Sequence, residues 1–246
     1  MQHSLFKYYS ERKWAESFLD GKILFRSLSY FRDYEEQAVR GDKYEGTSKY
    51  RPKNGLVVNN LTQGSTFTLA NHSFESSANA KEIFVFCVSR SLTAKMADEF
   101  HAAACVEIQQ IKTFCERIES ALPPNATFFG QRVEYYDESE GDDPRWALPE
   151  KIATSKLRGF AWQEEYRFAF CLTDALDFEK VKVSLVHDDH EKLRTANDHS
   201  EYLLDVRSLG DICRVHERAA IIKGDMSAAR GLPTPSVLSQ TLRSKC

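Results

Sequence analysis

The segment Ile83-Phe84-Val85-Phe86-Cys87-Val88 constrains the fold most, because it is a continuous apolar run rich in β-branched and aromatic side chains. So short an apolar run is typical of a strand buried on both faces, at the centre of a sheet. Such a strand needs neighbouring strands on each side and a covering layer on each face. The 246 residues of the chain are enough to build one well-filled core around it.

Shorter strand and helix patterns alternate along the rest of the chain without regular βαβ units. Strands are predicted at residues 5–9, 23–28, 105–108, 131–136, 166–172, 181–186, 202–206 and 219–222, with exposed strands or a hairpin within 48–80. Helices are predicted at residues 10–20, 92–103, 110–121 and 150–157. This order predicts an α+β fold, with a mixed, mostly antiparallel central sheet flanked by helices. We expect a single catalytic-type domain over residues 1–227 and a loosely held tail over 228–246.

Composition narrows the classes of protein to which the chain can belong. It is 42% hydrophobic and 28% charged, which is ordinary for a globular protein, and its net charge of −3 supplies no general attraction for nucleic acid. The N-terminus lacks a signal-peptide pattern, and no apolar stretch approaches the ~18 residues of a membrane span. We therefore expect a cytoplasmic protein with no membrane partner. The six cysteines form no C-x-x-C pair, so neither a zinc site nor a disulfide framework is predicted.

Charged residues enter an apolar strand directly in the segment Trp162-Gln163-Glu164-Glu165-Tyr166-Arg167. Strand alternation predicts that Gln163, Glu165 and Arg167 share one face. A Q-x-E pair at a strand entry is used by many ADP-ribosyltransferases, whose glutamate holds the nicotinamide ribose while the glycosidic bond breaks. A carboxylate there stabilises an oxocarbenium-like transition state. The simpler alternative is that Glu165 and Arg167 form a salt bridge on an exposed face.

A second motif, Ser89-Arg90-Ser91, follows the central strand. An S-x-S element at a strand end shapes the nicotinamide pocket in one class of these transferases, although such serines more commonly form turns or cap helices. The arginine of that class binds phosphate and comes earlier in the chain, where Arg26 is the candidate, with Arg32 and Arg40 behind it. The predicted catalytic residues are Glu165 and Gln163. The predicted NAD-binding residues are Arg26, Ser89, Ser91, Tyr8 and Arg167.

The acidic loop after residue 32 offers a different chemistry. Asp33, Glu35, Asp42 or Glu45, together with Glu165, could supply carboxylates to magnesium or manganese in a nuclease. The spacing matches no established metal loop, and the simpler interpretation is a salt-bridged loop with tyrosine packing. No metal is predicted for the transferase.

The order of the motifs resembles a widespread bacterial and phage family of unknown function that is linked with abortive infection and defence. The resemblance rests on Leu5–Ser10, Ile23–Glu35, Ile83–Ser89, Cys105–Ile108, Arg132–Tyr135 and Trp162–Arg167. The chain departs from the family at Phe31-Arg32-Asp33-Tyr34, which lacks the usual Asn and Pro, and at Gln163, where the first of two glutamates is expected. The resemblance implies a toxin or antiviral-defence context.

Three hypotheses follow from the sequence. The first is an enzyme with an ADP-ribosyltransferase-like fold, which binds NAD as substrate and transfers ADP-ribose to a macromolecule, either protein or nucleic acid. In it Glu165 is catalytic, Gln163 orients the acceptor, Arg26 binds phosphate, and Ser89 and Ser91 lie near the nicotinamide. The second hypothesis is a metal-dependent nuclease of a defence system. The third is a non-catalytic binding or sensor module, whose function would survive replacement of Glu165.

Overall fold

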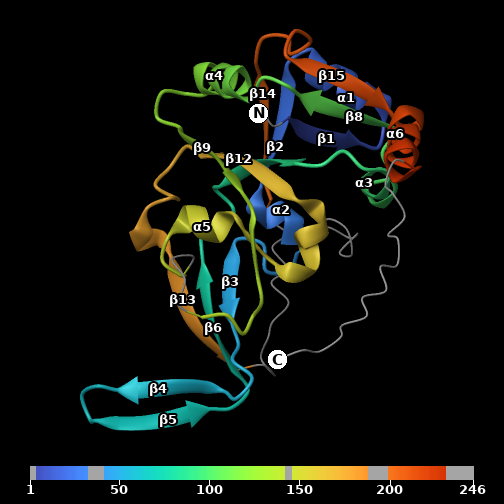
Figure 1. Cartoon of the computed structure of the whole chain (residues 1–246). Helices are drawn as coiled ribbons and strands as arrows, with labels where there is room; N and C mark the ends of the chain where they lie inside the picture. The colour runs from blue at the N-terminus through green and yellow to red at the C-terminus, as the bar shows by residue number, and fades with distance from the viewer. Residues whose placement is uncertain (1–3, 33–41, 142–145, 188–198, 231–246) are drawn as a thin grey trace, which may run out of the picture.

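The strand predicted at residues 83–88 is β7 (Phe84–Ser89), and it lies within an eight-stranded sheet. The computed structural model describes residues 4–32, 42–141, 146–187 and 199–230. Within them the chain forms an α+β domain, built on this large sheet and several helices (Figure 1). The strand order is β14-β2-β7-β1-β8-β15, and β12 pairs with β7 on one edge and β9 on the other. All the pairings described in this sheet are antiparallel.

The other strands of this sheet are short, as the sequence patterns predicted. They are β1 (Leu5–Tyr9), β2 (Lys22–Ser27), β8 (Ala104–Ile108), β9 (Thr127–Arg132), β12 (Glu165–Cys171), β14 (Glu201–Asp205) and β15 (Cys213–Glu217). Three smaller sheets accompany the large one. They are β13-β6-β3, made of β13 (Lys182–His187), β6 (His72–Ser77) and β3 (Thr47–Tyr50); the parallel pair β10 (Glu134–Tyr136) and β11 (Ser155–Leu157); and the hairpin β4 (Leu56–Asn60) and β5 (Ser65–Leu69).

Strand β7 is the point at which the large sheet forks. One of its edges pairs along its whole length with β12, from Phe84 opposite Phe170 to Ser89 opposite Glu165. The other edge is shared, because β2 pairs near the start of β7 and β1 pairs at its end, where Phe6 lies opposite Ser89. Strands β1 and β2 therefore diverge from a common neighbour, and residues at the two ends of β7 belong to different parts of the molecule.

Helices cover both faces of the large sheet. They are α1 (Arg12–Leu19), α2 (Leu28–Arg32), α3 (Ala94–Glu99), α4 (Ile111–Ala121), α5 (Pro149–Ala153) and α6 (Arg218–Arg230), with the 3₁₀ turns η2 (Arg158–Gln163) and η3 (Phe178–Lys180). Helix α4 ends just before Pro123-Pro124, as expected of residues that cannot continue a helix. Among the helices described, none has the length and apolar character needed to cross a bilayer.

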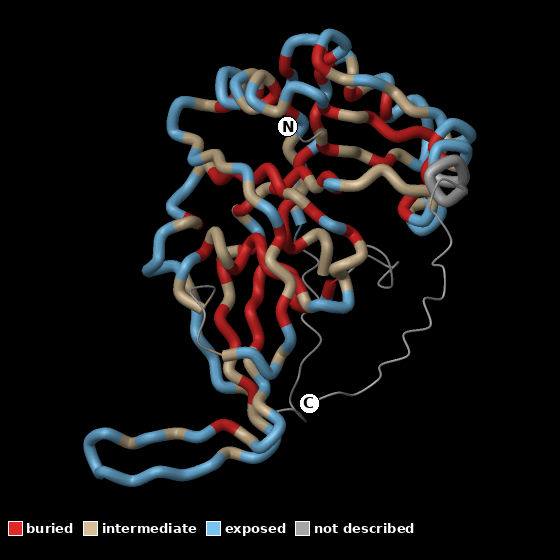
Figure 2. The backbone as a smooth tube through the Cα atoms, viewed as in Figure 1, coloured by how far each residue is buried: buried red, intermediate tan, exposed pale blue. Residues whose placement is uncertain are grey.

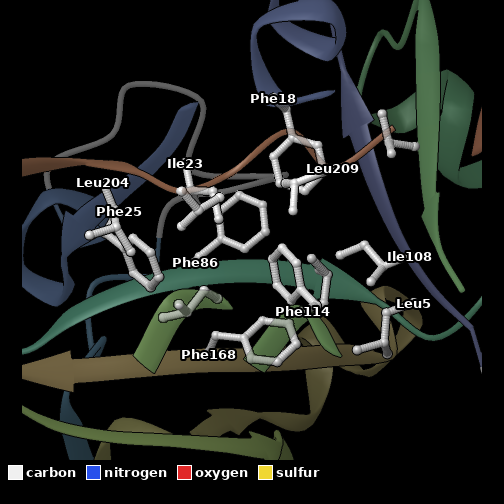
Figure 3. Packing of buried hydrophobic residues seen from close by; sticks show 14 of the residues in the cluster. Leu5, Phe18, Ile23, Phe25, Phe86, Ile108, Phe114, Phe168, Leu204 and Leu209 are labelled. Atoms are coloured by element: carbon white, nitrogen blue, oxygen red, sulfur yellow. The ribbon is translucent and has the colours of Figure 1, made fainter. Parts of the chain in front are cut away.

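The main core lies on the face covered by α1 and α4. Phe18 of α1 stacks on Phe86 with ring centroids 5.6 Å apart, and Phe114 of α4 meets Phe168 edge to face at 5.1 Å (Figure 3). All four rings are buried, and in Figure 2 the buried residues gather in the middle of the molecule. Because aromatic pairs add to the free energy gained from burying their area, this face supplies much of the stability of the sheet.

The opposite face carries two smaller apolar clusters instead of one. The first gathers Leu28 and Ile152 from α2 and α5 around Val85 and Ala169. The second gathers side chains of α3 and α6 around Tyr8 and Cys105; its buried members are Tyr8, Met96, Ala97, Ala102, Cys105 and Ile221. Strand alternation places Ser89 of β7 and Glu165 and Arg167 of β12 on this face, which they share with Val85 and Ala169. The sheet therefore buries polar and charged side chains on this face.

Several predicted elements are corrected by the structure. Residues 219–222 belong to helix α6, not to a strand, and the last sheet strand is β15, just before it. A short apolar run such as Ala219-Ala220-Ile221-Ile222 fits a helix as well as a strand by periodicity alone. Helix α6 runs from Arg218 to Arg230, and residues 231–246 of the predicted tail lie outside the described residues. The strand predicted at 131–136 is divided between β9 and β10, and the helix predicted at 150–157 ends at Ala153.

Gly21, in the turn between α1 and β2, provides a test of the packing. Its φ is +97°, and a Cβ added there would lie 2.3 Å from the carbonyl oxygen of Val206. We expect Gly21→Ala to lower the free energy of unfolding by about 2 kcal/mol or more, through strain and displacement of Val206. Gly159→Ala is the control, because a Cβ there meets nothing within 4 Å, and it should change stability by less than ~0.5 kcal/mol. Urea denaturation of both variants measures the difference; equal effects would contradict the described turn.

Candidate functional site

The Trp162–Arg167 segment does not form one continuous strand. Gln163 ends the 3₁₀ turn η2, Glu164 has a left-handed backbone with φ of 43°, and β12 begins at Glu165. A positive φ is uncommon for a residue other than glycine and marks a place where the surroundings dictate the backbone. The result is that Gln163 and Glu165 are buried whereas Glu164 is exposed.

Glu165 belongs to a buried cluster of four charged side chains. Its Oε1 accepts a hydrogen bond from Arg167 Nε at 2.6 Å, and its Oε2 lies 2.7 Å from Lys156 Nζ. Both terminal nitrogens of Arg167 also donate hydrogen bonds to the carboxylate of Glu45, at 2.5 and 2.9 Å. None of the four residues is more than 5% exposed. The salt bridge considered from the sequence therefore exists, but in the interior and not on an exposed face.

This charge cluster, defined as Glu45, Lys156, Glu165 and Arg167, joins segments that are far apart in the sequence. Glu45 lies just before β3, Lys156 lies on β11, and the other two lie on β12. Arg167 also donates to the carbonyl oxygen of Ala153 at 2.5 Å, at the end of α5. Two anions balance two cations, so the cluster can lie out of water only while every member keeps its partners.

Electrostatics keeps the charge cluster ionised. Burial by itself would raise the pKa of Glu165, but Arg167 and Lys156 hold that pKa well below its usual value. Burial opposes the charge of Lys156, yet the neighbouring Glu165 and Glu45 raise its pKa above the ordinary lysine value. Glu165 therefore remains a carboxylate at neutral pH and cannot donate a proton as a general acid.

Asp42 is a further buried carboxyl group beside the charge cluster. It is 3% exposed, and its Oδ1 accepts a hydrogen bond from the backbone N–H of Tyr44 at 2.9 Å. Burial, followed by the negative charge of Glu45, raises the pKa of Asp42 to about 6, although Lys156 and Arg167 pull it down. Asp42 therefore loses its proton at a higher pH than an ordinary aspartic acid.

The metal-site hypothesis is not favoured by this geometry. Asp33 and Glu35 lie outside the described residues. Glu45 and Glu165 do come together, but protein cations contact both oxygens of each carboxylate. Within the described ranges no group of three or more His, Cys, Asp and Glu side chains is arranged to hold a metal ion. A metal would have to displace Arg167 and Lys156.

The S-x-S motif meets the Q-x-E motif at the end of β7. Ser89 lies directly opposite Glu165, and its Oγ donates to the carbonyl oxygen of Gln163, 74 residues away, at 2.9 Å. Ser91 Oγ donates to Glu164 Oε2 at 2.6 Å. Ser91 does not cap the following helix, because Thr93 takes that role and accepts from the N–H of Met96. Both serines therefore hold the entry of β12.

Tyr8 completes the polar contacts of this site. Its hydroxyl donates to the carbonyl oxygen of Ser91 at 2.8 Å and accepts from the backbone N–H of Thr93 at 3.0 Å. Its ring lies 5.6 Å from that of Phe100, which in turn lies 5.5 Å from that of Trp162. Phe100 and Trp162 are only half-buried. The exposed residue Glu164 thus follows, two positions later in the chain, a partly exposed aromatic residue, Trp162.

The structure does not bring Arg26 to this site. Arg26 lies opposite Val85, four positions from Ser89 along β7, which at roughly 3.3 Å per residue is about 13 Å away. Its guanidinium pairs with Glu201 and lies over the ring of Tyr30 at 4.0 Å. Arg167 is also unsuited to a cofactor, because it is fully buried and bound to two glutamates.

Sequence reasoning missed Lys156 and the position of Glu164. Lys156 lies within the helix predicted at 150–157 but belongs to β11, and only its contacts with Glu45 and Glu165 identify it. Glu164 was expected on the face opposite Glu165, and its left-handed backbone could not be predicted from strand periodicity. For Glu45 the sequence left open a metal ligand and a member of a salt-bridged loop, and the structure places it in ion pairs with Arg167 and Lys156.

Comparison of the chain with protein-family models, curated proteins and solved structures finds no match. The resemblance to a defence-linked family therefore remains a prediction from the motifs.

Arg167→Met tests the buried charge cluster. The substitution leaves Glu45 and Glu165 short of a partner in the interior, so the free energy of unfolding should fall by about 3–5 kcal/mol. Arg158→Met is the matched control, because Arg158 also pairs with two carboxylates, those of Asp137 and Glu140, but is 51% exposed. It should cost less than ~1 kcal/mol. Chemical denaturation distinguishes the two; a loss as small for Arg167→Met as for Arg158→Met would contradict the cluster.

Asp42→Asn tests the raised pKa of this buried acid. The folded protein holds the proton up to about pH 6 whereas an unfolded chain releases it near 3.8, so ionisation of Asp42 opposes folding as the pH rises through that window. Above the window the variant should be more stable than wild type, by on the order of 2–3 kcal/mol. Below it the difference should vanish. Unfolding free energies measured across the pH range provide the check, and a constant difference at all pH values would exclude this cause.

Proposed function

We propose that the chain is an ADP-ribosyltransferase-like enzyme, in fold and in activity, that binds NAD and transfers ADP-ribose to a macromolecule. One observation carries the proposal. The S-x-S and Q-x-E motifs, predicted separately, meet at the end of β7, where Ser91 orients the exposed Glu164 carboxylate two residues after the partly exposed Trp162. The acceptor is a protein or a nucleic acid.

The chemistry of NAD suits these groups. The nicotinamide of NAD is a cationic aromatic ring, which the faces of Phe100 and Trp162 and a nearby carboxylate can attract. In the reaction the bond between nicotinamide and C1′ of the ribose breaks, and the bonding electrons leave with neutral nicotinamide. An acceptor nucleophile forms the new bond to C1′ and loses its proton. The positive charge that develops on the ribose is stabilised by the ionised carboxylate.

The assignment of roles differs from the sequence-based hypothesis in two respects. Glu164 replaces Glu165 as the carboxylate that meets the ribose, because Glu165 is buried and both of its oxygens are held by Arg167 and Lys156. Glu165 instead fixes the entry of β12. Arg90, exposed between the two serines and bound through its N–H to the carbonyl oxygen of Glu164, takes the phosphate-binding role considered for Arg26.

Tyr8, Ser89 and Gln163, which the sequence assigned to NAD or acceptor contacts, instead position the backbone and the charge cluster around Glu164. Tyr8 and Ser89 hold the backbone on either side of the carboxylate, at Ser91 and Gln163. Gln163 Oε1 accepts from Lys156 Nζ at 3.0 Å, so its side chain faces the charge cluster instead of an acceptor. The resemblance to a defence-linked family supports a toxin or antiviral context for the transfer.

The proposal is tested by incubating purified protein with labelled NAD and a lysate of its host, without added metal. Wild type should release nicotinamide and transfer label to a macromolecule. Glu164→Gln, which keeps the shape of the side chain, should lower the rate by about 10²–10³ without changing the melting temperature. Arg26→Ala is the control and should retain full activity, since it lies at the other end of β7.

Two outcomes would overturn the proposal. The first is that wild type neither binds NAD nor releases nicotinamide. The second is that Glu164→Gln is as active as wild type, because its carboxylate would then have no part in the reaction.

A further inference from the structure

The hairpin β4–β5 stands apart from the rest of the chain in composition. Residues 54–74 contain no Asp, Glu, Lys or Arg, although 28% of the chain is charged and about six charged residues would be expected in twenty-one positions. Surface segments normally carry such charges for solubility. The lack of charge therefore requires a reason other than burial, because the hairpin is largely exposed (Figure 2).

The hairpin projects from the body of the molecule (Figure 1). Its apolar side chains include Val57, Leu61 and Phe67, which are 64%, 92% and 46% exposed. Within the described ranges β4 and β5 pair only with each other. A two-stranded hairpin alone in water is at best marginally stable, so further pairing would stabilise this one.

The outer edge of β5 is the better docking edge of the two strands. Strand β4 packs against β6, and its first residue, Leu56, is buried. Strand β5 is exposed at four of its five residues, Ser65 to Thr68. It contains no Lys, Pro or other device that protects edge strands, and its Thr and Phe residues favour strand pairing.

Hydrogen bonds fix the turn at the tip of the hairpin, between β4 and β5. Asn60 Oδ1 accepts hydrogen bonds from the backbone N–H groups of Thr62 and Gln63, each at 3.1 Å. Gly64 provides the left-handed residue that the turn needs, with φ of +65°. The strand edge is therefore preformed, which lowers the entropy lost on pairing.

We infer that the edge of β5 pairs antiparallel with the edge of β5 in a second copy of this chain, forming a four-stranded sheet β4-β5-β5-β4. In a two-fold contact a charged residue of one strand lies opposite the same residue, or one close to it, in the other copy, and like charges there would repel. A strand without charged residues avoids this repulsion in a chain of net charge −3. The five-residue strand centres on Phe67, which lies opposite Phe67 of the second copy, while Thr66 faces Thr68. Val58, the cross-strand partner of Phe67 within each hairpin, extends the apolar row on the same face.

The inference is independent of the proposed transferase site and is tested by molecular mass. Sedimentation equilibrium of wild type should give a mass near twice the 28.2 kDa of one chain. Thr66→Lys with Thr68→Lys places like charges opposite each other across the new pairing and should give a monomer with an unchanged circular dichroism spectrum. Thr62→Lys with Gln63→Lys adds the same charge at the tip, outside the pairing, and should leave the dimer intact.

A cysteine substitution tests the register. Phe67→Cys should form a disulfide-linked dimer on mild oxidation, because the two copies of residue 67 face each other. Leu61→Cys, at a more exposed position that is far from the two-fold axis, should not. The inference is overturned if wild type remains monomeric at all concentrations, if the edge variant still dimerises, or if Phe67→Cys fails to cross-link.

Discussion

The bidentate pair between Arg167 and Glu45 is the interaction on which the arrangement of this molecule depends. Arg167 comes from the large sheet, and Glu45 from the segment leading into the small three-stranded sheet. Because an unpaired charge in the interior is strongly unfavourable, the two sheets can pack together only in the relative position that lets these groups meet. Lys156 and Glu165 extend the requirement to β11 and to the entry of β12. The balanced charges specify a geometry more than they add stability.

The exposed carboxylate of Glu164 follows from this buried geometry. Arg167 and Lys156 hold the Glu165 side chain in the interior, and Lys156 also donates a hydrogen bond to the buried side chain of Gln163. Glu164 lies between these two buried residues, and its left-handed backbone leaves it exposed. Ser91 then fixes the direction of its side chain. The buried charge cluster thus fixes the position of an exposed carboxylate, that of Glu164, two residues after the partly exposed Trp162.

The surface divides into two regions of different character. Around the body, exposed ion pairs such as that of Arg158 with Asp137 are common, and they keep a surface soluble without contributing much stability. The β4–β5 hairpin has no Asp, Glu, Lys or Arg, and in the part of the chain that the structure describes its strands pair only with each other. The proposed transferase site lies on the charged body, and the proposed contact between two copies lies on the uncharged hairpin. The two activities therefore use separate surfaces.

The sequence by itself determined the elements whose signal is local. The apolar run at 83–88, the amphipathic helix that ends before Pro123 and the strand patterns at 5–9 and 166–172 all became the expected elements, because burial periodicity and proline chemistry act over a few residues. The sequence also identified the two motifs that meet at the end of β7. Only the tertiary structure decided which glutamate is exposed, that Arg26 lies at the other end of β7, and that Lys156 belongs to the charge cluster. These depend on strand register and on charged partners up to 122 residues away, and no local pattern encodes the partner of a buried charge.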